Sequence, residues 1–414
     1  MIRRLILAAA LVAIALAEQT RYDGYKVFHV LPTEEQLSLL DPFQNHPGYD
    51  FWSRSRHAGH PVDIMVSPTY VDIFEEYLVR NKMTYQIIIH DVQMVFDAER
   101  LRQMTPTNAT ARAISFSKYL TVDEINSYLT SLASSYPSIV SVESIGRSYE
   151  GRPLNMIKIS SGGGGSRPVI LIDAGIHARE WIAPAMALYV INQLVESGNH
   201  KDLYASVDWH IIPVINPDGY AYSHSTTRLW RKTRSQTSNS RCPGVDANRN
   251  FGFHWMEVGA SSSPCDETFA GSKAFSEPET AALQSYTLAN KNRIKLYLTF
   301  HSYGNYLLYP WGYTSTLPSD WKTLDDLAKA ANSAQVAAGG DRYTIGSSTN
   351  VLYAAAGGSD DWVKGVGGVS LSYTIELPGG GWYGFDLPAS SISSTVKEFF
   401  PAVRVFGEYV TKNY

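Results

Sequence analysis

The segment Val169–Trp181, VILIDAGIHAREW, joins a strand-like run to a cluster of ionisable side chains. Its first four residues are apolar and mostly β-branched, which is typical of a strand buried on both faces. The nine residues that follow include Asp173, His177, Arg179 and Glu180. Open α/β sheets bind ligands outside the carboxyl ends of their strands. The segment therefore predicts a functional site at the edge of a sheet.

Two further strand-like segments are followed by residues of the same chemistry: His301 comes directly after Phe300, and Glu376 comes directly after Ile375. The spacing of His177 and Glu180 lets both side chains face one way on a single turn, and His301 would complete a set of two imidazoles and one carboxylate. That set leaves an open position on tetrahedral zinc and indicates a catalytic site with one Zn²⁺ per chain. Asp246 or the backbone is expected to hold an imidazole in its tautomer. A salt-bridged strand end without metal is the alternative, because His-x-x-Glu also occurs by chance.

Residues 113–414 alternate strand-like and helical segments. We expect an α/β domain with a mixed, mostly parallel central sheet and helices on both faces. The predicted strands are Val140–Ile145, Leu154–Ile159, Val169–Asp173, Trp209–Ile215, Ile294–Phe300 and Val369–Ile375. The predicted helices are Val122–Ser134, Ala183–Val195, Lys322–Val336 and Thr395–Val410. Such a sheet brings the ends of distant strands together at one edge.

The first part of the chain divides into a leader and a small folded unit. Residues 1–17 contain two arginines, an apolar run too short to span a bilayer and a final Ala-Leu-Ala, which predict a secretory signal peptide; a membrane anchor is the alternative. Residues 18–112 hold three strand-like and two helical segments and then a polar connector. This order favours a small α+β domain of ferredoxin-like type.

Because residues 1–17 are predicted to be a secretory signal peptide, we expect a secreted, extracellular protein.

Composition and cysteine content narrow the functional classes. A net charge of −4 with scattered basic residues gives no electrostatic basis for binding nucleic acid. Beyond the leader, no stretch of sequence is long and apolar enough to predict a membrane span. The two cysteines, Cys242 and Cys265, predict one disulfide in a secreted chain, with two free thiols as the alternative. Asn108 begins a glycosylation sequon.

Longer motifs follow the His-x-x-Glu pair in a fixed order. They are RLWRKTR at 228–234, GVDANRN at 244–250, SEPE at 276–279, FHSY at 300–303, GGSDDW at 357–362 and IEL at 375–377. In this order they closely resemble the pancreatic-type zinc carboxypeptidases of the A/B family, over essentially all of residues 113–414. The N-terminal unit resembles the activation domain of that family. The resemblance thus implies a secreted procarboxypeptidase that hydrolyses the C-terminal peptide bond of peptides and proteins.

The resemblance also implies a role for each site residue. His177, Glu180 and His301 would bind zinc, and carboxypeptidase A is an established example of this ligand set. Glu376 would be the general base and proton shuttle, and Arg231 would stabilise the developing oxyanion. The other implied roles are terminal-carboxylate binding for Asn248, Arg249 and Tyr353, neighbouring subsites for Arg179, Tyr303 and Phe385, and a disulfide for Cys242 and Cys265.

Asp360, in the motif GGSDDW, bears on which residue is removed. In the family this position lies at the base of the pocket for the substrate's last side chain. A desolvated carboxylate attracts a cation and would lie unpaired beneath an apolar side chain, so we expect a B-type preference for C-terminal Lys or Arg. Gly312, Ser348 and Gly358 are small enough to leave room for a long side chain. An A-type preference is the alternative, if Asp360 points away and Asp361 shifts the register.

The activation domain is expected to cover the metal site until a trypsin-like protease cuts after Arg112. Arg100 and Arg102 are competing cleavage sites, and the mature enzyme would begin near Ala113. A permanent regulatory or folding domain is the alternative for this unit. For the whole chain, the alternative is an inactive module that binds C-terminal peptides. We expect a monomer whose partners are peptide substrates with free C-termini and the activating protease.

Overall fold

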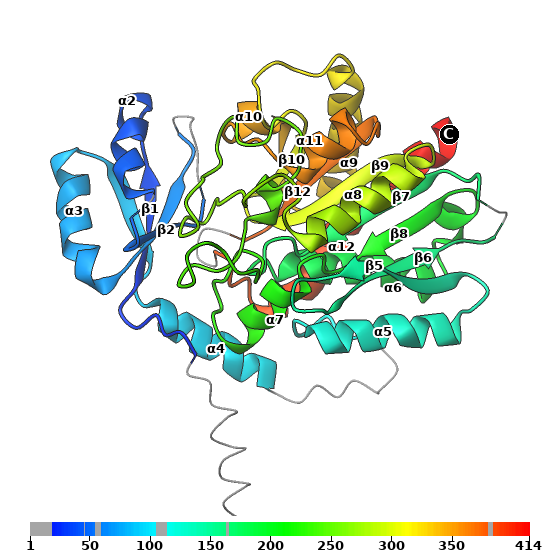
Figure 1. Ribbon diagram of the computed structural model, residues 1–414, viewed down its shortest axis with the longest axis horizontal. Helices are drawn as coiled ribbons and strands as arrows, with labels where there is room; N and C mark the ends of the chain where they lie inside the picture. The colour runs from blue at the N-terminus through cyan, green and yellow to red at the C-terminus, as the bar shows by residue number, and fades with distance from the viewer. Residues whose placement is uncertain (1–18, 45, 54–58, 105–113, 163–164, 380–383) are drawn as a thin grey trace, which may run out of the picture.

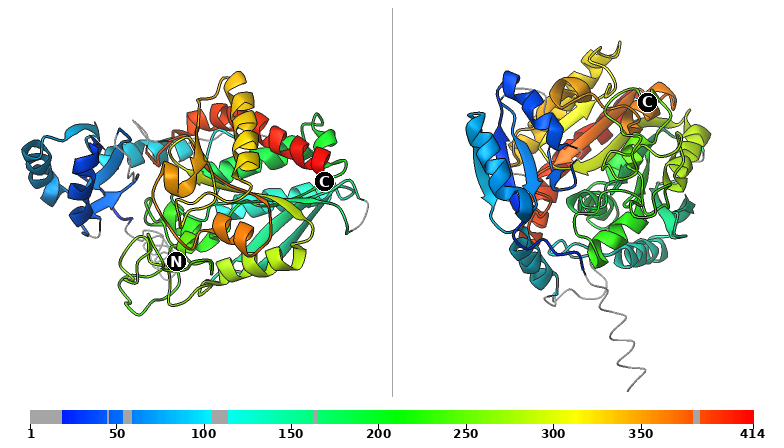
Figure 2. Two further views of the ribbon diagram at one scale, coloured as in Figure 1. Left: turned by 90° about the horizontal axis from the view of Figure 1, so that it is seen from above. Right: turned by 60° about the vertical axis from the view of Figure 1, so that its left-hand side comes forward.

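The structure is a computed structural model that describes residues 19–44, 46–53, 59–104, 114–162, 165–379 and 384–414. The chain forms a small N-terminal unit and a large C-terminal unit, and helix α4 (Val92–Met104) runs from the first unit along the second (Figures 1 and 2). The predicted leader 1–17, the sequon at Asn108 and the predicted cleavage site at Arg112 lie outside the described residues. Among the residues described, no helix is both long enough and apolar enough to cross a membrane.

The small unit is an antiparallel sheet with helices against one face. Its strands run in the order β2-β3-β1-β4. Its elements are β1 (Lys26–Leu31), α2 (Glu34–Leu37), η1 (Ser38–Phe43), β2 (Tyr49–Phe51), β3 (Val62–Val66), η2 (Pro68–Tyr70), α3 (Val71–Arg80) and β4 (Thr84–Ile89). Alternate residues of β1 face opposite sides: Phe28 packs with Phe74 of α3, whereas Val27 belongs to a cluster that includes residues of the large unit. The predicted α+β unit is confirmed, and its second face serves the contact with the large unit.

The large unit is built on an eight-stranded mixed sheet in the order β11-β10-β12-β9-β7-β8-β6-β5. Its strands are β5 (Val140–Arg147), β6 (Pro153–Ile159), β7 (Val169–Ala174), β8 (Asp208–Ile212), β9 (Ile294–Ser302), β10 (Tyr306–Tyr309), β11 (Thr344–Ser347) and β12 (Leu371–Leu377). The four central strands β12, β9, β7 and β8 are parallel, and antiparallel pairings flank them. The carboxyl ends of the four central strands therefore lie along one edge.

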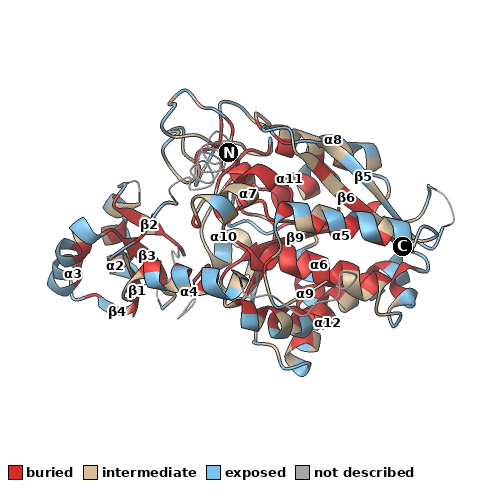
Figure 3. Cartoon of the chain, turned by 90° about the horizontal axis from the view of Figure 1, so that it is seen from below, coloured by how far each residue is buried: buried red, intermediate tan, exposed pale blue. Residues whose placement is uncertain are grey.

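Helices cover both faces of this sheet, as predicted. Ile170 and Ile172 of β7 belong to a core shared with α5, α6, α9 and α12, whereas Val169 and Leu171 belong to a core shared with α8 and α11. The remaining elements are α5 (Val122–Ser135), α6 (Ile182–Val195), η3 (Lys201–Tyr204), α7 (Pro217–Ser225), η4 (Ala247–Arg249), α8 (Pro278–Asn290), α9 (Trp321–Ala337), α10 (Ser348–Val351), α11 (Ser359–Gly365) and α12 (Ala389–Asn413). Figure 3 shows the buried central strands and α6 between more exposed outer helices.

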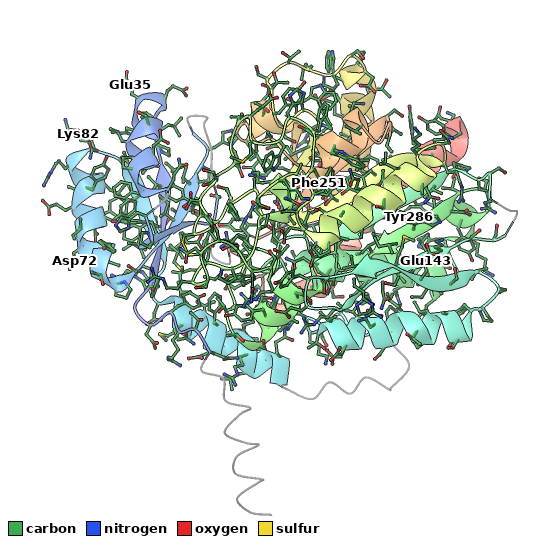
Figure 4. The ribbon with its side chains drawn as sticks, viewed as in Figure 1. Glu35, Asp72, Lys82, Glu143, Phe251 and Tyr286 are labelled. Atoms are coloured by element: carbon green, nitrogen blue, oxygen red, sulfur yellow. A yellow bond between two sulfur atoms is a disulfide. The ribbon has the colours of Figure 1, made fainter. Side chains whose placement is uncertain are left out.

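The structure extends the predicted elements at several places. The six predicted strands of the large unit are all present, but the short strands β10 and β11 and the helices α7, α8 and α11 carry weak periodicity and were not predicted. The predicted helix 395–410 begins earlier, at Ala389. In the small unit, the first predicted helical segment is expected over Glu34–Leu40; the structure has the short α-helix α2 there, followed by the 3₁₀ helix η1, which contains Pro42. Charged residues of the small unit such as Glu35 and Asp72 lie on its outer surface, whereas Phe251 lies in the interior of the large unit (Figure 4).

Candidate active site

The turn after β7 carries the first two metal-binding candidates. Gly175 follows the strand with a φ of +67°, a conformation that glycine adopts without steric cost. A Cβ atom at Gly175 would lie 3.1 Å from Cγ of Pro184, so glycine also lets α6 pack close to the turn. Asn216, beyond the end of β8, donates from Nδ2 to the carbonyl of Ile176 at 3.0 Å. The neighbouring loop therefore fixes the turn that ends in His177.

His177, Glu180 and His301 converge at the carboxyl ends of β7 and β9. Nδ1 of His177 lies 2.7 Å from Oε1 of Glu180, and Nδ1 of His301 lies 3.1 Å from Oε2 of the same carboxylate. The two Nδ1 atoms face each other at 3.2 Å, and one potential ligand atom from each residue lies within 4.8 Å of the others. Two imidazole nitrogens and a carboxylate at these distances, all buried, fit a shared divalent cation with an open position.

The Glu180 carboxylate and the two imidazoles each stabilise the charged form of the other. Burial raises the cost of ionising Glu180, but the adjacent imidazoles of His177 and His301 bring its pKa well below its usual value. Burial alone would lower the pKa of His301, yet the Glu180 carboxylate raises it to about 9. The site thus attracts positive charge strongly, which is the electrostatic condition for holding a metal ion.

Asp246 fixes both a candidate ligand and a candidate catalytic cation. Its Oδ1 lies 3.1 Å from Nε2 of His177, and its Oδ2 accepts from Nη2 of Arg231 at 2.8 Å. Burial opposes its ionisation, but Arg231 and His177 hold its pKa well below its usual range. A carboxylate on Nε2 leaves Nδ1 of His177 available to a metal. Of the two acceptors considered from the sequence, the structure selects Asp246.

Glu376 stands beside the cluster because β12 and β9 pair in parallel. Glu376 and His301 are register partners in this pair. Oε2 of Glu376 is buried and, within the described part of the chain, has no hydrogen-bond partner. Burial and the negative charge of Glu180 together raise the pKa of Glu376 to about 8, against the opposing charges of His301 and Arg231. A carboxyl group with a raised pKa and a free oxygen is suited to moving protons near neutral pH.

A cavity of about 290 Å³ joins these groups to the other predicted site residues. The predicted residues that line it are His177, Glu180, Arg231, Asn248, Arg249, Tyr303, Tyr353, Asp360, Glu376 and Phe385. His301 and Arg179 complete the set from positions behind this lining: His301 contacts Glu180, and Arg179 lies over the ring of Phe385 at 4.3 Å. The structure therefore gathers all twelve predicted metal, catalytic and substrate-binding residues in one region.

Arg249, Asn248 and Tyr353 form a polar group in one wall of the cavity. The guanidinium of Arg249 donates to the carbonyls of Gly259 and Asn248, both at 2.9 Å, and its Nη2 lies 3.4 Å from the Tyr353 hydroxyl. Oδ1 of Asn248 accepts from the backbone N–H of Ser359 at 2.9 Å. These bonds orient a cation and two hydrogen-bonding groups, a combination suited to a carboxylate.

Asp360 and Asp361 both lie in the first turn of helix α11, but their side chains have different surroundings. Asp361 accepts the backbone N–H groups of Gly312 at 2.9 Å and of Tyr313 at 3.1 Å, so its carboxylate is committed to the backbone. Asp360 lines the cavity, and its Oδ2 is buried without a partner among the described residues. Burial raises its pKa. Gly358 provides space for it, since a Cβ there would lie 2.9 Å from Oδ1 of Asp360.

The small unit closes this cavity with residues that sequence reasoning missed. Asp50 accepts from Nη1 of Arg179 at 2.8 Å, and Asp63 accepts from the Tyr303 hydroxyl at 2.8 Å. Trp52, which also lines the cavity, packs against Phe385 with ring centroids 5.5 Å apart. These residues carry no motif, because their role depends on the docking of one unit on the other. Cys242 and Cys265 form the predicted disulfide.

Comparison with known proteins agrees with this geometry. Residues 125–402 match the family model described as zinc carboxypeptidase, and residues 28–99 match the model described as carboxypeptidase activation peptide. The chain belongs to the zinc carboxypeptidase family. It is thus a zinc-dependent carboxypeptidase that carries an activation peptide, which is the organisation of a zymogen.

Relatives of this carboxypeptidase include proteins named carboxypeptidase A and proteins named carboxypeptidase B. It is 51% identical over 301 residues to a carboxypeptidase B of Astacus astacus, covering 72% of this chain and 99% of the relative. It is 37% identical to a carboxypeptidase A1 of Bos taurus, covering 99% of each chain. The crystal structure of a carboxypeptidase A from Helicoverpa armigera superposes with a TM-score of 0.87 at 32% identity, covering 94% of this chain and 98% of that one. Similarity alone therefore leaves the preferred C-terminal residue open.

Proposed function

We propose that this zymogen, once activated, removes C-terminal Lys and Arg residues from peptides and proteins. The observation that carries the proposal is the Asp360 carboxyl group, buried in the cavity with one oxygen unpaired among the described residues. A cationic side chain entering the cavity would pair with that oxygen, whereas an apolar side chain would leave it desolvated and unsatisfied. Asp361 is a poor substitute because backbone N–H groups already bind it.

His177, Glu180 and His301 are the proposed zinc ligands. Zinc bound there would act as a Lewis acid that polarises the scissile carbonyl, and it would lower the pKa of a bound water towards neutral pH. Glu376, with its raised pKa and unpaired oxygen, takes a proton from the attacking water and returns it to the leaving amine. Arg231, held by Asp246 at 2.8 Å, presents a fixed positive charge to the oxyanion that develops at the scissile carbonyl.

Recognition of a free C-terminus is proposed for Asn248, Arg249 and Tyr353. A guanidinium and two neutral hydrogen-bonding groups match the charge and geometry of a terminal carboxylate. Tyr303, Phe385 and Arg179 are proposed to contact residues further from the cleaved bond. In the zymogen Asp63 and Asp50 hold Tyr303 and Arg179, which accounts for a latent state. We further propose that the protein is secreted as a monomer and that a trypsin-like protease activates it by cutting after Arg112.

The test compares activated wild-type enzyme with Asp360→Ile and the isosteric Asp360→Asn. Hydrolysis of matched peptides that end in Arg, Lys, Leu or Phe would be measured with and without a chelator. Breaking a buried ion pair costs about 3–5 kcal/mol, so kcat/KM for Arg ends should fall at least about 100-fold in both variants. Asp360→Ile should gain activity on apolar ends. A wild-type enzyme that prefers Phe, or an Ile variant that still prefers Arg, would contradict the proposal.

A further inference from the structure

A second buried ion pair joins the activation segment to the large unit outside the cavity. Glu99 of α4 accepts from Nε and Nη2 of Arg228, at 2.7 and 3.1 Å. The same guanidinium donates to the carbonyls of Arg179 at 3.0 Å and Phe385 at 2.7 Å and stacks over the ring of Trp181 at 3.6 Å. Arg228 is thus fixed in place by the large unit, while its carboxylate partner belongs to the segment that leaves on activation.

Asp386 places another carboxyl group next to this pair. It follows Phe385, whose carbonyl binds Arg228, and it precedes Leu387, whose carbonyl accepts the Tyr119 hydroxyl at 2.7 Å. Only 4% of Asp386 is exposed, and its Oδ1 has no hydrogen-bond partner in the regions that the structure describes. A buried carboxyl oxygen without a donor is costly and requires an explanation.

The charges around Asp386 explain how the zymogen tolerates it. Burial and the negative charge of Glu99 raise the pKa of Asp386 to about 7, and the positive charges of Arg228 and Arg102 oppose this rise. Burial raises the pKa of the nearby Tyr119 hydroxyl, and the negative charges of Glu99 and Asp386 raise it further. Two carboxyl groups therefore compete for one well-placed guanidinium, and Glu99 binds it in bidentate geometry.

We propose that Asp386 is the replacement partner of Arg228: in mildly acidic solution it stays protonated while Glu99 is docked, and it ionises and pairs with Arg228 when the activation segment departs. The proton goes to solvent, and the large unit keeps a neutral Arg–Asp pair in place of an uncompensated cation. This inference rests on the proposed activation by cleavage of the connector. It adds that release of the segment is itself sensitive to pH.

The sign follows from proton linkage. The docked state has the higher Asp386 pKa, because Glu99 is near and Arg228 is occupied, so it binds more protons than the separated state. Raising the pH from 5.5 to 7.5 should therefore weaken retention of the cleaved segment, by about tenfold or more for one linked proton, with little further change above pH 8. The device would hold the segment in mildly acidic surroundings and release it at neutral pH.

The experiment uses the full-length zymogen, cleaved in the connector with trypsin and checked for complete cleavage on a denaturing gel. Retention of the cleaved segment is measured from pH 5.5 to 8 by size-exclusion chromatography at several protein concentrations. The pH dependence should largely disappear in Asp386→Asn, and retention at pH 7.5 should rise towards its pH 5.5 value. An unchanged pH dependence in Asp386→Asn would overturn the proposal.

Two further variants keep the result interpretable. Glu99→Gln should weaken retention and also flatten its pH dependence, even if Asp386→Asn folds poorly. His29→Gln is the control, because His29 contacts Asp63 at the same interface with a raised pKa and could titrate there. A pH dependence that His29→Gln alone removes would assign the effect to His29 and overturn the role of Asp386. Absence of activity after complete removal of the segment would instead contradict the proposed function.

Discussion

Glu376 and His301 are register partners on the adjacent parallel strands β12 and β9. Side chains paired in this way lie on the same face of the sheet, so the strand pairing sets the position of the proposed base relative to the proposed zinc ligand. The buried position gives Glu376 a raised pKa of about 8.

Replacing Glu376 with Gln should lower kcat by about 10²–10⁴-fold, because the isosteric amide cannot accept the proton. KM for an Arg-ended peptide should change little, since Glu376 is not proposed to bind the ground state. Zinc content, measured by atomic emission, serves as the control for an intact site. A variant that retained a tenth of wild-type kcat would exclude Glu376 as the base.

Asp246→Ala should weaken zinc binding by about 10–100-fold, because His177 would lose the carboxylate that fixes its tautomer. Competition with a chelator of known affinity measures the change without reference to activity. Asp208→Ala is the matched control: Asp208 is a buried aspartate paired with Arg293 at 2.7 Å, at the opposite end of the sheet strands. Equal zinc affinities for the two variants would contradict a role for Asp246 at the metal site.

Glu279→Gln should stabilise the protein, and more so at pH 8 than at pH 5. Burial, with minor contributions from the charges of Glu277 and Asp218, raises the pKa of Glu279 to about 7. The folded state therefore binds the proton more tightly than the unfolded state, and wild-type stability falls as pH rises from about 4.5 to 7. The full effect is about 3 kcal/mol.

The measurement is the melting temperature of wild type and Glu279→Gln at each pH, both loaded with zinc. Glu35→Gln, an exposed change on α2, is the control and should show no such divergence. If the difference in melting temperature between wild type and Glu279→Gln stayed constant from pH 5 to pH 8, the predicted proton linkage would be ruled out.

Asp50→Ala should make the uncut zymogen less latent. Asp50 pairs with the buried Arg179 at 2.8 Å, and loss of one partner of such a pair is strongly destabilising. Activity of the intact zymogen on a small Arg-ended substrate should rise about tenfold or more, with unchanged activity after complete activation. Asp72→Ala changes an exposed aspartate on α3 of the same unit and should have no effect. Full latency in Asp50→Ala would show that this contact does not restrain the segment.

Local pattern determined much of the fold. Val169–Ile172 is a continuous apolar run, and only Thr299 interrupts the apolar run Leu296–Phe300; such runs are typical of strands buried on both faces of a sheet. Their strands and the helices that cover them could therefore be predicted, as could the candidate ligands at the strand ends. By contrast, β11 (Thr344–Ser347) and α7 lack such patterns, because tertiary contacts rather than periodicity stabilise them.

The sequence by itself determined the ligand types, the His-x-x-Glu spacing and the order of motifs, since these are properties of neighbouring residues. Only the tertiary structure decided that Asp246 supports His177, that Asp360 rather than Asp361 faces the cavity, and that Asp50, Asp63 and Glu99 close the zymogen. Those contacts join residues far apart in the chain. They depend on strand register and on the docking of two units, which no local pattern of side chains specifies.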